Sequence, residues 1–77
     1  MTVTYDANGG TGTIPTEFVT KGQTYTVQFD TLPTKSGKVF DGWATSANGA
    51  VVYTSSGTKT FTASNDSYTL YAHWANA

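Results

Sequence analysis

The segment 68–74, which begins at Tyr68 and ends at Trp74, constrains the fold more than any other part of this sequence. Its side chains are mostly aromatic or otherwise strand-favouring, and a turn signal at residues 65–67 precedes it. Because side chains alternate across a strand, one face is apolar and the other is amphipathic. The two faces consist of Tyr68, Leu70, Ala72 and Trp74, and of Thr69, Tyr71 and His73. This pattern predicts a central strand with neighbours on both edges and partial cover on its second face.

Composition indicates a domain that is all-β or nearly so. The chain has 77 residues, which suffice for one hydrophobic core, and it has no cysteine to crosslink that core. Sixteen threonines and six serines stand against nine charged side chains, and threonine favours pleated surfaces over helices. Apolar residues do not recur with helical period, so little or no helix is expected. The aromatic residues are the core candidates, and Trp43 and Trp74 should both be mostly buried.

Charge and hydropathy exclude several classes of function. The net charge is −1, and the four lysines are dispersed with no arginine beside them, so the sequence offers no stripe for phosphates and nucleic acid is not an expected partner. No apolar run is long enough to cross a membrane, and no basic stretch precedes an apolar one as in a signal peptide. We therefore expect no membrane insertion.

Further strands are expected where apolar and polar residues alternate. Residues 2–6 form the first strand, which ends at the Asn8-Gly9 turn, and residues 16–21 form a second strand antiparallel to it. Residues 25–29 form a third strand or an irregular crossing. Leu32 is expected to plug the loop that follows.

The second half of the chain carries another strong strand at residues 39–44. Strict alternation would place Phe40 and Trp43 on opposite faces, but Gly42 permits a bulge or a close backbone approach that brings both rings to the core. A hairpin signal follows at residues 48–49. Residues 51–53 are then a short returning strand, and residues 58–63 are another short strand or an extended segment with Phe61 buried.

Five short blocks follow one another in a recognisable order. They are residues 3–10, residues 22–25, residues 32–33, Gly37 with residues 39–43, and residues 68–74. In this order they resemble the Listeria–Bacteroides repeat, also called the internalin B-repeat. The resemblance covers nearly the whole chain and implies that residues 1–77 are a single module excised from a longer multi-repeat protein. It also implies a mostly β, β-grasp-like (ubiquitin/SUMO-like) fold with a four-stranded mixed sheet and little or no helix.

The resemblance further implies a function and a location. Such modules occur in secreted or wall-anchored bacterial surface proteins, so this chain is expected to be a non-enzymatic extracellular spacer or stalk with a part in adhesion to host or neighbouring cells. The alternative is a dedicated module for a carbohydrate or protein receptor that uses exposed aromatic residues. Expected partners are adjacent repeat modules and a cell-surface protein or glycan. No cofactor is expected, and the isolated module should be a monomer.

Thr69, Tyr71 and His73 are the candidate ligand contacts. If the amphipathic face of segment 68–74 is open, they form a flat polar and aromatic strip that suits glycan stacking or protein contact. The alternative, which we favour, is that a loop or the segment 51–61 covers them.

No catalytic or metal site is expected. His73 is the only histidine and lacks evident partners, and residues 6–10 resemble the start of a calcium loop but lack its later ligands. Asp6, Asp30 and Asp41 could pair as acids, but the ordinary role of Asp6 and Asp41 at strand ends is to cap free N–H groups.

The sequence contains the residue types that two covalent modifications require. Lys21, Asn65 and Glu17 could in principle form an intramolecular isopeptide bond, but this reaction needs an apolar environment, and Lys21 precedes Gly22 in an expected turn. Residues 65–67 form a glycosylation sequon, which would normally be idle in a bacterial protein. We expect neither modification.

Overall fold

The computed structural model describes residues 1–64 and 66–77, and its regular structure consists of strands alone. The strands are β1 (Thr2–Asp6), β2 (Glu17–Phe18), β3 (Thr24–Thr26), β4 (Lys38–Ala44), β5 (Thr60–Thr62) and β6 (Ser67–Asn76). This confirms a mostly β fold class. No helix that could cross a membrane occurs among the described residues.

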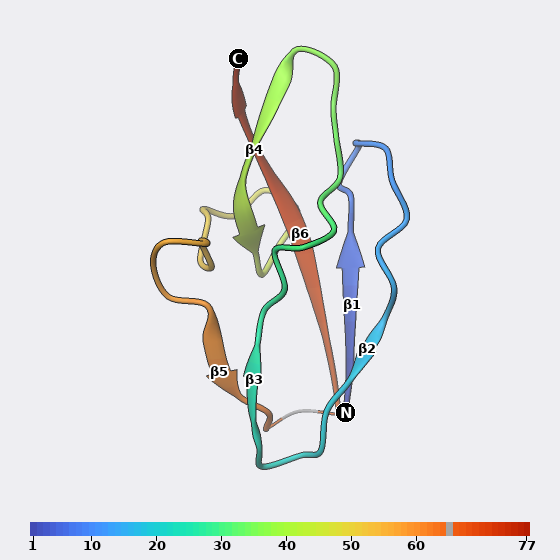
Figure 1. The fold of residues 1–77 in the computed structure, drawn as a ribbon, viewed down its shortest axis with the longest axis vertical. Coiled ribbons are helices and arrows are strands. Elements are labelled where there is room, and N and C mark those ends of the chain that lie inside the picture. Colours follow the sequence, from blue (N-terminus) through green and yellow to red (C-terminus); the bar gives the residue numbers. More distant parts are fainter. Residues whose placement is uncertain (65) are drawn as a thin grey trace.

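Four strands form a mixed sheet in the order β2-β1-β6-β4 (Figure 1). The long strand β6 lies inside this sheet, parallel to β1 and antiparallel to β4. The central position predicted for segment 68–74 is therefore confirmed. The first strand has the predicted bounds, and β2 is antiparallel to it as expected, but β2 is limited to Glu17 and Phe18.

A second, two-stranded sheet pairs β3 with β5, with Tyr25 opposite Phe61. The ring of Phe61 lies 5.5 Å from that of Tyr25 and 4.7 Å from that of Tyr68, measured between centroids. The small sheet therefore packs against the apolar face of β6. β5 lies within the predicted segment 58–63, whereas β3 overlaps the predicted segment 25–29 but begins one residue before it. Each strand is shorter than expected.

The core lies between these two sheets. Its buried members come from β1, β3, β4, β6 and the loops beside them, and they are Val3, Tyr5, Ile14, Tyr25, Val27, Trp43, Leu70 and Ala72. Trp43 is fully buried, as predicted, whereas Trp74 is only half-buried at the rim of the core. Trp74 is less enclosed because the pairing of β1 with β6 ends at Tyr71, before β6 reaches Trp74.

The predicted irregularity at Gly42 is present. The register between β4 and β6 shifts between Phe40 and Gly42, which marks a bulge. Gly42 has a φ of 142°, and a Cβ atom there would meet Cγ2 of Val51 and lie 2.5 Å from the carbonyl oxygen of Tyr53. The bulge brings the rings of Phe40 and Trp43 to a centroid distance of 4.9 Å. Both rings thus contribute to one core.

Leu32 does not plug its loop, which corrects the sequence-based expectation. Its side chain is 42% exposed, and the neighbouring Pro33 is buried instead. Thr34 and Thr11 exchange two backbone hydrogen bonds of 2.6 and 2.9 Å, which fix this loop against the loop after β1. This pairing turns Pro33 inward and leaves Leu32 outside.

Phe18 is a second correction, because it is 79% exposed although the aromatic residues were the core candidates. It pairs with Thr2, while Glu17 pairs with Val3. Since Val3 is in the core, the face that carries Thr2 and Phe18 points away from it. The expected returning strand at residues 51–53 is reduced to a single bridge between Tyr53 and Trp43.

Candidate functional site

A polar hollow of about 270 Å³ lies where β6 continues past the end of β1. The turn after β1, the loop before β4 and the turn after β4 surround it. Its lining consists of Asn8, Lys35, Ala47, Asn48, Gly49, His73 and Trp74. We call it the His73 hollow.

The turn after β1 forms one wall of the His73 hollow. Asn8 and Gly9 have φ values of 51° and 87°, and the N–H of Gly10 donates to the carbonyl oxygen of Ala7 at 3.0 Å. Asn-Gly favours this kind of tight reversal, because both residues tolerate positive φ. The Asp6 carboxylate accepts a 2.7 Å hydrogen bond from the backbone N–H of Asn8. Asp6 therefore has the capping role predicted for it.

The side-chain amide of Asn8 joins three segments of the chain. It donates to the carbonyl oxygens of Ala47 at 2.8 Å and Ala72 at 3.0 Å. Ala72 is the first residue of β6 beyond its pairing with β1, so Asn8 replaces the missing strand there. These two bonds hold the turn after β4 against β6 and give the hollow a fixed shape.

Trp74 supplies an aromatic wall whose polar group is already used. Its indole N–H donates to the carbonyl oxygens of Ala7 and Asn8, each at 3.1 Å. A Cβ atom on Gly10 would lie 2.5 Å from Cζ2 of the ring, so the turn can approach the indole only with glycine at this position. The indole is thus locked in place and offers only apolar surface to the hollow.

His73 is held by Asp41 from the neighbouring strand. Its Nδ1 lies 3.0 Å from Oδ2 of Asp41. This is an ion-pair distance without hydrogen-bond geometry, because Nδ1 has no hydrogen-bond partner among the described residues. Nδ1 is itself buried, while the side chain as a whole is 31% exposed. The exposed part of the imidazole is therefore the edge that carries Nε2.

The partnership of Asp41 with His73 was missed at the level of sequence. Asp41 was expected to cap a loop, but it is the extra residue of the β4 bulge, between Phe40 and Gly42. A bulge redirects side chains, which brings Asp41 toward its cross-strand neighbour. Gly42 indicated a bulge at this point of the sequence, but it did not indicate that β6 would lie opposite.

Lys35 is a half-buried cation beside the turn after β1. Its Nζ would lie 3.3 Å from a Cβ atom placed on Gly9. The ion pairs among the described residues join Lys21 to Asp66 and His73 to Asp41, so no carboxylate pairs with Lys35 there. None of the residues that line the hollow is acidic.

The predicted contact residues Thr69, Tyr71 and His73 share one face of β6. Only His73 lines the hollow. Thr69 is exposed, and Tyr71 is half-buried. Phe61, in the segment considered as cover, packs instead against Tyr68 on the opposite face. The strip as a ligand surface stays a prediction.

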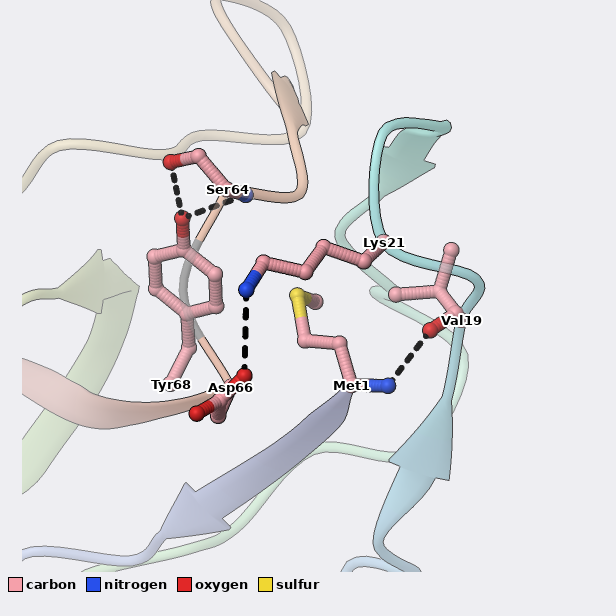
Figure 2. A network of polar contacts seen from close by, with 6 residues as sticks. All are labelled: Met1, Val19, Lys21, Ser64, Asp66 and Tyr68. Atoms are coloured by element: carbon pink, nitrogen blue, oxygen red, sulfur yellow. Dashed lines mark hydrogen bonds and ion pairs between the residues drawn. The ribbon is translucent and has the colours of Figure 1, made fainter.

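Lys21 and Glu17, two of the three residues of the hypothetical isopeptide bond, have other partners. Lys21 forms a 3.2 Å ion pair with Asp66 at the surface, where both side chains are mostly exposed (Figure 2). Glu17 instead accepts a 2.6 Å hydrogen bond from the hydroxyl of Tyr25. Residue 65, which carries both the proposed amide and the sequon, lies outside the described residues. Lys21 therefore lacks the apolar environment that this reaction needs.

A buried hydroxyl pair near β3 was also missed by sequence reasoning. The hydroxyl groups of Tyr5 and Tyr25 are hydrogen-bonded to each other, and the N–H of Gln28 donates to Tyr5 at 3.3 Å. Burial, and then the hydrogen bond to Glu17, raise the pKa of Tyr25 well above its ordinary value. Burial also raises the pKa of Tyr5. Both hydroxyls are neutral donors that join β1, β3 and β2.

The remaining acidic groups give no metal site. No group of three or more His, Cys, Asp or Glu side chains within residues 1–64 and 66–77 could hold a metal ion. Asp30 is exposed, and its backbone N–H donates to the side chain of Gln28 at 3.1 Å.

Strand order and size define a small module built from a four-stranded and a two-stranded sheet. The chain belongs to the Listeria-Bacteroides repeat domain family, whose model matches residues 2–73. This confirms the resemblance. Members of the family occur in bacterial surface proteins, and the family is not known as enzymatic. A search of curated proteins and a search of solved structures found no match to the chain.

Proposed function

We propose that this chain is a non-enzymatic extracellular module that acts as a spacer in a bacterial surface protein and takes part in adhesion by holding binding regions away from the cell. One observation carries the proposal. Met1 and Ala77 lie at opposite ends of the longest axis of the molecule (Figure 1), which extends 38 Å.

This placement of the termini follows from the topology of the sheet. β1 begins the chain and β6 ends it, and the two are parallel neighbours with Thr2 opposite Ser67 and Asp6 opposite Tyr71. The chain therefore enters at one end of this pair and leaves at the other. Copies joined head to tail would extend along the axis, whereas a module with adjacent termini would fold the array back on itself.

The same topology suits a module that bears load. Force applied to the two termini would slide β1 along β6, and the hydrogen bonds of that pair would share the load rather than open one at a time. The parallel central pair with antiparallel outer strands also supports a β-grasp-like fold as part of the proposal. A location at the bacterial cell surface fits this role.

Small-angle X-ray scattering on fused copies tests the spacer proposal. Proteins with one, two and three copies, joined directly from Ala77 of one copy to Met1 of the next, should grow in maximum dimension by up to about the 38 Å length of one copy at each step. A matched set with long glycine-serine linkers gives the dimension of flexibly joined copies. Side-by-side packing, with little growth in length, would refute the proposal.

A further inference from the structure

We propose that the His73 hollow binds a single acidic sugar unit through its carboxylate. This is a ligand site beyond the spacer role. The recognition chemistry consists of a cation with no carboxylate partner among the described residues, an imidazole, amide groups and an aromatic wall. These groups come from the loop before β4, from the turns after β1 and β4, and from β6, which supplies both the imidazole and the indole.

The charge of the hollow favours an anion. Lys35 contributes the one permanent charge among the lining residues, and no described carboxylate pairs with it. An ammonium group that has lost part of its hydration gains more from a counter-ion than one in open water. The carboxylate of Asp41 lies 3.0 Å from His73 and lines a different hollow beside β4, and the carboxylate of Asp6 accepts a hydrogen bond from the backbone N–H of Asn8.

The imidazole of His73 adds direction to this charge. Oδ2 of Asp41 lies 3.0 Å from the buried Nδ1, which leaves the exposed edge with Nε2 available to a ligand. A neutral ring would accept a hydrogen bond there from a sugar hydroxyl, and a protonated ring would donate one to an anion. Both forms therefore interact with a molecule that carries hydroxyls and a carboxylate.

The other walls favour a sugar over a bare inorganic ion. The indole of Trp74 offers apolar surface, because its N–H is bound to the turn after β1, and aromatic surface of this kind packs on the C–H face of a pyranose. The side-chain NH2 group of Asn8 already donates two hydrogen bonds, and the amide oxygen remains available as an acceptor. The exposed Asn48 adds an amide at the rim.

Size limits the ligand to one sugar unit. The volume of about 270 Å³ is just below the range of about 300–1,000 Å³ that is typical of drug-sized pockets. A longer acidic glycan would place one unit in the hollow and extend into solvent. Few buried contacts imply weak binding, with an expected Kd of about 1–10 mM for a single unit.

Nuclear magnetic resonance titration of the whole 77-residue chain with glucuronate tests this inference. Saturable shifts should appear at the side-chain amide of Asn48, the imidazole of His73 and the indole of Trp74, and they should weaken as salt is added. Glucose supplies the same ring without charge, and acetate supplies the carboxylate without the ring. Each should bind at least about fivefold more weakly than glucuronate.

Two variants test whether Lys35 supplies the positive charge that binds glucuronate. Lys35→Gln should weaken glucuronate binding by about fivefold to tenfold, whereas Lys59→Gln, with the same loss of charge at a lysine whose Nζ donates to the carbonyl oxygen of Ser55, should leave it unchanged. Unchanged spectra of both free variants show that they fold.

Several outcomes would overturn the inference. They are no saturable shift in the millimolar range, shifts centred away from the hollow, equal weakening by both lysine variants, or glucose binding as tightly as glucuronate. If acetate binds as tightly as glucuronate, the site recognises a bare carboxylate and the assignment to a sugar is wrong.

Discussion

Gly42 lies at the point where β4 bends and the core closes. Its φ of 142° disfavours any side chain, and the carbonyl oxygen of Tyr53 occupies the place of a Cβ atom. Gly22 is a useful comparison, because its φ is 94° but nothing lies within 4 Å of its Cβ position. The pair therefore separates backbone strain from steric overlap.

Gly42→Ala should lower the free energy of unfolding by about 3 kcal/mol, through strain and overlap together. Gly22→Ala should lower it by about 1 kcal/mol, through strain alone. Urea unfolding followed by circular dichroism measures both. Equal losses in the two variants would show that the close approach of Tyr53 to Gly42 has no energetic consequence.

The tyrosine pair predicts how stability depends on pH. The pKa of Tyr25 is raised in the folded chain above the ordinary value of 10.0, so between the two pKa values only the unfolded state releases this proton. The stability that the neutral Tyr25 hydroxyl contributes is fully present well below pH 10 and is lost progressively as pH rises through and above this value. The free energy of unfolding should therefore fall from about pH 9 to about pH 11.

The variant Tyr25→Phe should show a shallower fall over this range, because one of the titrating hydroxyls is absent. It should also be less stable at neutral pH by about 1–3 kcal/mol, since Tyr5 and Glu17 lose a hydrogen-bond partner. Urea titrations at several pH values measure both effects. A pH dependence identical to that of the original chain would exclude Tyr25 as its source.

Strands β4 and β6 carry the two tryptophans into unequal environments. Trp43 is fully buried, with its indole N–H bound to the carbonyl oxygen of Gln28 at 3.1 Å. Trp74 lies near the end of β6, half-buried under the turn after β1. Because Trp43 is more buried, it should contribute more than Trp74 to the free energy of unfolding.

Replacement of Trp43 by Ala should lower the free energy of unfolding by about 3–5 kcal/mol. A domain of this size has a free energy of unfolding of only a few kcal/mol, so most molecules of this variant would be unfolded at room temperature. Trp74→Ala should lower it by roughly half as much, because less apolar surface is lost from the core. Thermal unfolding of both variants measures this order, and a larger effect at Trp74 would contradict it.

At the scale of the whole molecule, the two outer strands of the four-stranded sheet offer little backbone for pairing with a second copy. β2 has two residues, and part of the outer edge of β4 is bonded to Val52 and Tyr53 through the N–H and carbonyl groups of Trp43. Lys38 stands at the start of β4, where a charge disfavours edge-to-edge association.

We therefore expect the isolated chain to be a monomer in dilute solution. Light scattering across a concentration series, at low and high salt, measures its molecular mass. In fused copies the effective concentration reaches the millimolar range, so weak contacts between neighbours could form there. A stable dimer of the single chain at micromolar concentration would show that self-association is a property of the module itself.

The sequence by itself determined where the chain is extended and which side chains share a face, because alternation is a local property that each segment carries alone. The bounds of β1, the central role of β6, the bulge at Gly42 and the Asn8-Gly9 turn were accessible in this way. The family was accessible as well, since its blocks can be compared without coordinates.

Only the tertiary structure decided which segments meet. Asn8 bonds to Ala72 across 64 positions, and Asp41 reaches His73 from another strand. Alternation gives the face of a side chain but not its partner, so the His73 hollow, the exposure of Phe18 and the parallel pairing of β1 with β6 had no local signal. These features depend on how the two sheets share one core, which is a property of the chain as a whole.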